Sequence, residues 1–217
     1  MSIFSISYSD DLKTRIAELL DGRSVRLASR SPRRREILTT LGINFDQYTP
    51  EGEEDFDPHV RGEDPVARSL EITRYKAAEG AKGAARGIVI AADTIVVLGG
   101  NILSKPVDRD EAVAHLTRLA GRDHHVYTSL VITDTDFGVE VSGTSDSLVT
   151  FKSVTEAEIA GYVATGEPND KAGAYGIQGM GKFLVDKFTG NLDNIIGFPA
   201  FLFVELLEKL NKQRVRR

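Results

Sequence analysis

The sequence predicts an α/β protein with a mixed central sheet and flanking helices. Strand-like and helix-like stretches alternate over most of the 217 residues, an order typical of α/β folds. Residues 87–100 form a strongly apolar run rich in β-branched side chains, which predicts a central strand. Residues 125–133 and 139–151 alternate in polarity and predict paired antiparallel strands. The sheet should therefore contain both parallel and antiparallel pairs.

The first part of the chain predicts two helices around a buried strand. A short helix is expected near residues 10–20 and a strand over 24–29. Ser31 is a good N-cap and Pro32 suits the first helical position, so a second helix should begin there. Gly42 can close that helix.

An exposed loop and a long helix should follow. A strand is expected over residues 43–49, and the acidic, Pro- and Gly-flanked residues 50–64 predict a loop. Asp64 and Pro65 should then begin a helix that runs to about residue 85.

Turn and capping signals organise the second half of the chain. Residues 99–101 predict a tight hairpin into a strand over 102–106. Two capping-box patterns predict helix starts: Asp108 with Glu111, and Thr155 with Glu158. Residues 171–181 contain too many glycines for a regular element, whereas 197–210 predict a final amphipathic helix.

Composition excludes several classes of function. The chain has 27 basic and 32 acidic residues and a formal net charge of −5, which argues against a general nucleic-acid coat or a membrane-surface protein. The absence of cysteine excludes disulfides, thiolate metal sites and a cysteine nucleophile. Neither a secretory signal nor a membrane-spanning apolar run is evident, so a cytoplasmic location is expected.

Three consecutive arginines, Arg33 to Arg35, fall in the first turn of the helix that should begin at Pro32. Backbone N–H groups are unpaired there and the helix dipole is positive, so each cation should cost roughly 0.3 to 1 kcal/mol unless an anion is present. A bound phosphate would make the same turn favourable. The pattern predicts a local anion site.

Asp93 interrupts the most apolar strand of the chain. An unpaired carboxylate is costly to bury, so this residue needs compensation. The strand could fray there and leave Asp93 to cap a turn; alternatively, Asp93 is a catalytic base or a metal ligand. Because breaks in a strand pattern often mark functional positions, we favour the second interpretation. Thr94 beside it is either strand filler or a hydroxyl that faces the substrate.

Some charged residues suggest a function only when they are considered together with the arginines and Asp93. Glu53, Glu54 and Asp55 alone indicate a solvated loop, but facing phosphates they would require a divalent cation between them, Mg²⁺ or Mn²⁺. Lys76 and Lys105 would be surface lysines on sequence alone.

The glycine-rich residues 172–179 allow the main chain to approach a ligand closely. Tyr175 is available there for stacking and Gln178 for a two-way amide contact. The segment does not match a P-loop, and no GxGxxG sequence follows the first strand. The four histidines show no zinc-site spacing.

Four stretches of the chain closely resemble the Maf family of nucleoside triphosphate pyrophosphatases. They are "LASRSPRRREIL", "AADTIVV", "LSKPVDRDEAVAHLTRLAGRDHHVYTSL" and "NDKAGAYGIQGMG". The resemblance implies a Maf/ITPase-like fold, an elongated mixed sheet in two lobes around a cleft, and hydrolysis between the α and β phosphates. It also implies an N-terminal extension over residues 1–23, one catalytic domain over 24–217, and a homodimer.

The resemblance assigns roles to individual positions. Asp93 matches the family's general base, and Glu54, with Glu53 as a further candidate, matches its loop carboxylate; Glu54 and Asp93 would hold the metal. The phosphate-binding turn is matched by Ser29, Arg33 and Arg34, and the family's two lysines by Lys76 and Lys105.

Three positions indicate the subgroup. Arg33, Thr94 and Gln178 resemble members that act on dTTP and UTP, whereas members that act on 7-methyl-GTP differ there. Phe198 stands where the family usually has leucine, an apolar change that should concern packing. The alternatives are a pyrophosphatase for 7-methyl-GTP or another modified nucleotide, and a phosphate- or nucleic-acid-binding cell-division factor without catalysis. We expect a nucleoside triphosphate as the partner, rather than nucleic acid or a membrane.

Overall fold

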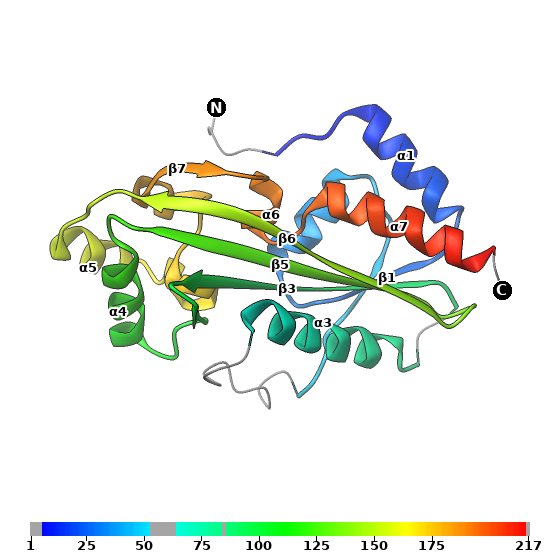
Figure 1. The fold of residues 1–217 in the computed structure, drawn as a ribbon, viewed down its shortest axis with the longest axis horizontal. Coiled ribbons are helices and arrows are strands. Elements are labelled where there is room, and N and C mark those ends of the chain that lie inside the picture. The colour runs from blue at the N-terminus through cyan, green and yellow to red at the C-terminus, as the bar shows by residue number, and fades with distance from the viewer. Residues whose placement is uncertain (1–5, 53–63, 84–85, 216–217) are drawn as a thin grey trace.

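The computed structural model describes residues 6–52, 64–83 and 86–215. Within these ranges it confirms the predicted mixed α/β class, with one sheet covered by helices on both faces (Figure 1). The helices are α1 (Asp10–Leu20), α2 (Pro32–Thr40), α3 (Pro65–Ala81), α4 (Arg109–Leu119), α5 (Glu156–Ala164), α6 (Leu192–Ile196) and α7 (Ala200–Arg214). Short 3-10 helices are η2 (Glu167–Asp170), η3 (Ala172–Ala174) and η4 (Gly179–Leu184).

The sheet has the strand order β2-β1-β3-β5-β6-β7, and β4 pairs with β3 outside this path. Its strands are β1 (Val25–Ala28), β2 (Asp46–Tyr48), β3 (Ile88–Leu98), β4 (Asn101–Leu103), β5 (Asp123–Asp134), β6 (Val139–Phe151) and β7 (Val185–Thr189). β1 runs parallel to β2 and β3, whereas the remaining pairs are antiparallel. The predicted central strand and its antiparallel neighbours are confirmed.

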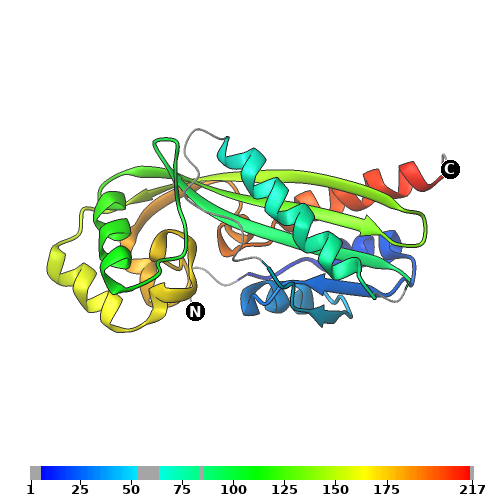
Figure 2. The ribbon, with the colours of Figure 1, turned by 90° about the horizontal axis from the view of Figure 1, so that it is seen from below.

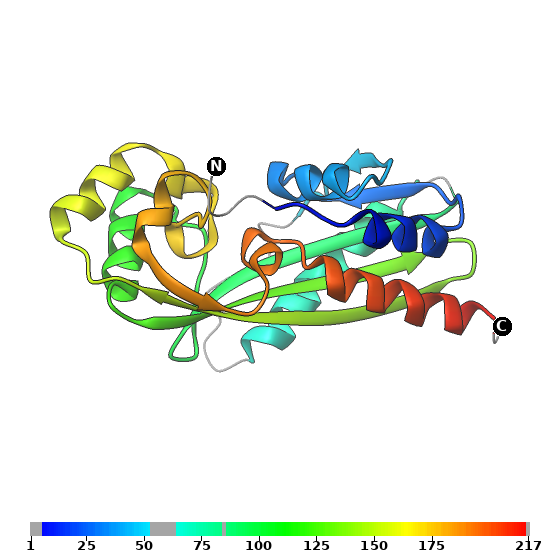
Figure 3. The ribbon, with the colours of Figure 1, turned by 90° about the horizontal axis from the view of Figure 1, so that it is seen from above.

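Three long strands join two lobes. β3, β5 and β6 run the length of the molecule (Figure 2). At one end α1, α2, α3 and α7 surround the sheet together with β1 and β2; at the other end lie α4, α5, β7 and the 3-10 helices (Figure 3). The implied two-lobed, elongated architecture is therefore present.

Local signals explain where α2 ends. Gly42 has φ +77°, and the N–H of Ile43 donates to the carbonyl of Leu38 at 3.0 Å, which is the glycine-closed helix end that the sequence predicts. Ile43 is then buried in the main core and does not belong to a strand. β2 is therefore shorter than the strand expected over residues 43–49.

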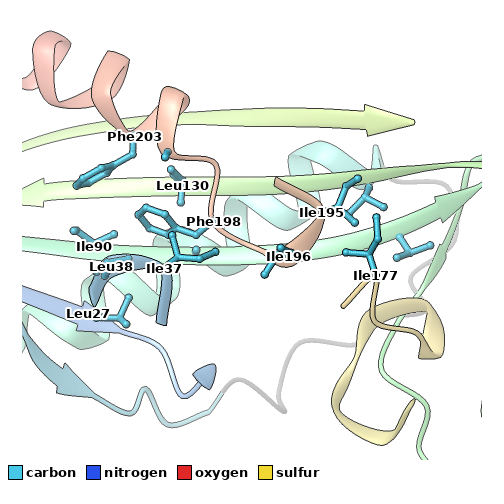
Figure 4. Close-up of a cluster of buried hydrophobic side chains, with 14 of the residues drawn as sticks. Leu27, Ile37, Leu38, Ile90, Leu130, Ile177, Ile195, Ile196, Phe198 and Phe203 are labelled. Atoms are coloured by element: carbon cyan, nitrogen blue, oxygen red, sulfur yellow. The ribbon is translucent and has the colours of Figure 1, made fainter. Parts of the chain in front are cut away.

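The larger core fills the face of the sheet that α2 and α7 cover. Figure 4 shows side chains from β1, α2, β3, β5 and α7 packed together there. Phe198 is fully buried, and its ring centroid lies 5.3 Å from that of Phe203. Its role is therefore in packing, as the sequence predicts.

The opposite face of the sheet is lined by small side chains beneath α3. Ala28, Ala77 and Ala91 are fully buried there with Val89 and Val131. A Cβ added to Gly80 of α3 would lie only 2.6 Å from the Cβ of Ala28. This close approach brings the side chains of α3 within reach of polar groups on β3.

Residues before β1 pack against the end of the chain. The hydroxyl of Tyr8 donates to Asp193 of α6 at 3.2 Å, and the guanidinium of Arg23 donates to the side-chain oxygen of Asn211 in α7 at 2.9 Å. In the part of the chain that is described, no helix is long and apolar enough to cross a membrane.

Candidate active site

One pocket of about 360 Å³ gathers residues from both lobes, a volume typical of small-ligand sites. Nine of the residues that the sequence analysis singles out line it: Ser29, Arg33, Arg34, Lys76, Asp93, Thr94, Lys105, Tyr175 and Gln178. Two segments form its sides. We call residues 28–34 the α2 wall and residues 170–178 the glycine wall.

The α2 wall contains the start of α2, at the position that the sequence predicts. Pro32 occupies the first position of α2, and the side chain of Ser31 accepts a hydrogen bond from the N–H of Arg34 at 3.5 Å. β1 and β3 are parallel neighbours with Ala28 opposite Ala91, so the end of β1 delivers this helix start close to Asp93.

Arg34 is more deeply embedded than its position in a first turn predicts. Only 9% of the residue is exposed. Its guanidinium donates to the carbonyl of Gly197 at 3.0 Å, and to the hydroxyls of Ser29 and Thr94 at 3.1 Å each. These acceptors offset the unfavourable helix dipole, so Arg34 also holds the lobe together.

Arg33 reaches across the pocket. Its guanidinium donates to Asp170 of the glycine wall at 2.9 Å, while Lys171 contacts the other carboxylate oxygen at 2.7 Å. Burial raises the pKa of Asp170, but hydrogen bonds from Lys171 and Arg33 outweigh it and hold the pKa below its ordinary value. The two walls are thus joined by an ion pair.

Asp93 lies inside β3 and has the compensation that its burial requires. Residues on both sides of it pair with β5, so the interpretation that the strand frays there is wrong. Its Oδ1 accepts from the Nζ of Lys76 at 2.8 Å, and the side chains are 14% and 4% exposed, respectively. Lys76 comes from α3 over the small-residue face. Lys76 therefore lies directly beside Asp93.

Thr94 points to the opposite face of β3 from Asp93. Its hydroxyl contacts that of Thr128 at 2.9 Å, which in turn donates to the carbonyl of Asn194. The residue sits in the sheet and also lines the pocket; that its hydroxyl faces a substrate stays a prediction. Lys105 is exposed at the pocket edge, and Gln178 is half-buried there.

Glu54, Glu53 and Asp55 lie outside the described residues. Among the residues that are described, no group of three His, Asp or Glu side chains is placed to hold a metal. Mg²⁺ often binds through only one or two carboxylates together with substrate phosphates. Asp93 lines the pocket and offers one such carboxylate, whose Oδ1 accepts from Lys76.

Tyr175 is less available for stacking than its glycine-rich setting indicates. The residue is 6% exposed, and its hydroxyl lies 2.8 Å from the Nε2 of His124. Its ring meets the rings of His124 and Phe151 edge to face. Burial lowers the pKa of His124 to about 4, so this histidine is neutral near pH 7. Through its contacts with Tyr175, His124 therefore supports the glycine wall.

Several pocket residues escape the sequence analysis. Asp170, Lys171 and Arg30 also line the pocket. Arg30 directly precedes the N-cap of α2, and the pair at 170–171 directly precedes the glycine-rich run. Their position beside recognised motifs is a signal that could have identified them.

Comparisons with known proteins agree with this geometry. The family model described as "Maf-like protein" matches residues 24–210. A "dTTP/UTP pyrophosphatase" of Escherichia coli (strain K12) is 40% identical over 195 residues, covering 89% of this chain and 96% of that protein. A "Nucleoside triphosphate pyrophosphatase" of Shigella flexneri shows the same identity and coverage.

Two solved structures are more distantly similar. The Ham1 protein of Staphylococcus aureus has a TM-score of 0.41 and 16% identity, with 59% of this chain and 72% of that chain covered. A dITP/XTP pyrophosphatase of Mycobacterium abscessus has a TM-score of 0.38 and 15% identity, with 60% and 75% covered.

Proposed function

Because this chain belongs to the Maf family, we propose that it is a nucleoside triphosphate pyrophosphatase that converts dTTP and UTP to the monophosphate and pyrophosphate. The observation that carries the proposal is the pocket itself, where cations from both lobes surround the partly buried Asp93. The relatives named for this activity match nearly the whole chain.

The cations of the pocket suit a triphosphate. Arg33 belongs to the α2 wall, Lys105 lies at the pocket edge and Lys76 lies beside Asp93, so several phosphate groups can be contacted at once. Arginine pairs with phosphate through two parallel N–H groups, and lysine acts as a point charge. A bound phosphate competes with Asp170 for Arg33, which makes the ion pair between the walls exchangeable.

Asp93 takes the proton of the attacking water in this proposal. The water oxygen bonds to the α-phosphorus, the bond from that phosphorus to the bridging oxygen breaks, and its electron pair leaves with pyrophosphate. Lys76 keeps the Asp93 carboxylate in place through its hydrogen bond, and it can also offset charge on the phosphates.

A divalent cation, Mg²⁺ or Mn²⁺, would be held by Asp93 and Glu54 together with phosphate oxygens. When bound, it supplies Lewis acidity and neutralises phosphate charge. The substrate's base would meet Gln178 and Thr94, which line the pocket with Arg33. Gln178 offers both an amide donor and a carbonyl acceptor, which suits the edge of uracil or thymine.

Pyrophosphate release from the purified chain tests the proposal. The panel is dTTP, UTP, dCTP, dGTP and 7-methyl-GTP, each with Mg²⁺, with Mn²⁺ and with a chelator. We expect cation-dependent release that is fastest from dTTP and UTP. Preference for 7-methyl-GTP would keep the chemistry and overturn the base assignment.

Failure on every nucleotide would contradict catalysis. The salt dependence of binding to an oligonucleotide then becomes the decisive measurement, because a polyanion-binding protein loses affinity steeply as salt rises. A closed triphosphate site should instead depend mainly on the divalent cation.

A further inference from the structure

The segment that carries Gln178 is held at both ends by two side chains that stand behind it. These are Glu167 at the start of η2 and Tyr162 of α5. The Oε2 of Glu167 accepts from the N–H of Met180 at 2.9 Å, and its Oε1 accepts from the N–H of Gly181 at 3.1 Å. The carboxylate thus fixes the main chain two and three residues after Gln178.

Tyr162 fixes the main chain just before Gln178. Its hydroxyl accepts from the N–H of Gly176 at 3.2 Å and donates to the Oε1 of Glu167 at 2.9 Å. The residue is 3% exposed, and burial raises the pKa of its phenol, so the hydroxyl remains protonated and able to donate. One connected network therefore spans residues 176–181.

The glycines of this segment make the close approach possible. Gly179 has φ +75°, and a Cβ built there would lie 2.9 Å from the Oε2 of Glu167. A Cβ at Gly181 would lie 2.5 Å from the hydroxyl of Tyr162. The absence of side chains at these two glycines therefore lets the Glu167 carboxylate and the Tyr162 phenol approach the main chain closely.

The network stands one layer away from the pocket. Gly176, Ile177 and Gln178 line the pocket, whereas the described residues that line it do not include Glu167 or Tyr162. Ile177 is 3% exposed and packs in the main core, which anchors the segment from its other side. The main chain that carries Gln178 is therefore held on either side of it.

We propose that Glu167, acting with Tyr162, is a positioning residue that sets the placement of the Gln178 amide against the substrate's base. The inference rests on the proposed function, because it needs Gln178 to contact a base. Since Glu167 is not among the described residues that line the pocket, its loss should change the choice between bases more than the rate of hydrolysis.

A carboxylate is chemically required at this position. An ionised glutamate only accepts hydrogen bonds, so it can receive both N–H groups and the phenol together. A glutamine has one accepting oxygen, and its amide N–H₂ would face a donor. Glu167→Gln therefore conserves shape and disrupts the network.

The test compares base selectivity in matched variants. For the wild type, Glu167→Gln and Tyr162→Phe, kcat and KM are measured on dTTP, UTP and dCTP. We expect the ratio of kcat/KM for dTTP over dCTP to fall about tenfold in Glu167→Gln and less in Tyr162→Phe. The kcat on dTTP should change less than this ratio.

Glu158→Gln is the control variant. Glu158 also accepts a backbone N–H through its carboxylate, from Thr155 at 2.8 Å, but it lies at the exposed start of α5. A glutamine can preserve that capping box. The selectivity of this variant should equal that of the wild type.

A double variant separates positioning from general loss of stability. If Glu167 acts through Gln178, then Glu167→Gln combined with Gln178→Ala should be no less selective than Gln178→Ala alone. Losses that multiply, or an unchanged dTTP to dCTP ratio in folded Glu167→Gln and Tyr162→Phe, would overturn the inference. Inactivity of the wild type on all nucleotides would instead contradict the proposed function, so the two failures are distinguishable.

Discussion

The main chains of the two pocket walls are held in place by different means. The α2 wall is a strand followed directly by a capped helix, so Ser31 and Pro32 orient it through contacts within a few residues. The glycine wall combines a 3-10 turn with irregular main chain, and Tyr162 and His124 hold it from more distant positions. Glu167 holds the main chain that follows it, at Met180 and Gly181.

The difference shows two ways of placing a ligand-binding group. A helix start supplies a rigid frame whose direction is set locally, which suits a phosphate that is the same in every nucleotide. A glycine-rich turn fits closely around a ligand, but it needs buried partners to limit its freedom. The ion pair between Arg33 and Asp170 at 2.9 Å connects the two.

The largest effect should come from Asp93, which lines the pocket together with both walls. We predict that Asp93→Asn lowers kcat by about 10³-fold, because the variant loses its proton acceptor. The substitution also leaves the buried Lys76 beside a neutral partner, so some loss of stability is expected. Activity should be measured well below the melting temperature, and near wild-type turnover there would remove Asp93 from the mechanism.

The α2 wall was predictable because its determinants are close in sequence. An N-cap, a proline and a run of arginines fall within five residues, and they predict both the helix start and the anion site. Asp93 was identified for a similar reason, since one carboxylate breaks an apolar strand.

The glycine wall could be predicted only in part. Its glycines indicate an irregular segment that approaches a ligand, but Glu167, Tyr162 and His124 act through contacts between distant positions. The network of Arg34 with Gly197 likewise depends on tertiary packing, over a separation of 163 residues. No local pattern encodes such contacts.

A pH titration should reveal the glycine wall's dependence on buried side chains. Burial lowers the pKa of His124 from its ordinary 6.5 to about 4 in the folded chain. The unfolded chain therefore binds a proton first as the pH falls. Stability should decrease between pH 6.5 and 4 by roughly 2 to 3 kcal/mol, and this contribution is retained above pH 6.5.

Urea unfolding at several pH values checks this titration. His124→Gln cannot titrate in that range, so the difference in stability between wild type and variant should shift across the interval. A difference that stays constant from pH 7 to pH 4 would show that His124 is not the group responsible.

Alanine substitutions at two adjacent arginines of the α2 wall should separate an effect on stability from an effect on substrate binding. Arg34→Ala leaves buried acceptors without a donor, so we predict a loss of about 2 kcal/mol in unfolding free energy. Arg33→Ala removes a partly exposed ion pair worth less than about 1 kcal/mol, and should instead raise the KM for dTTP about tenfold. Equal melting temperatures for the two variants would contradict this division.

The smallest effect isolates the cost of the first-turn charge itself. Arg35 is exposed and lies outside the pocket lining, in the same turn as the two binding arginines. Arg35→Ala should stabilise the substrate-free chain by about 0.3 to 1 kcal/mol, because a cation opposes the helix dipole there, and high salt should reduce the gain. Arg118, exposed in the last turn of α4, is the matched control; its replacement by alanine should have the opposite sign. If Arg35→Ala destabilises the chain as Arg118→Ala does, the dipole does not explain why the α2 wall favours an anion.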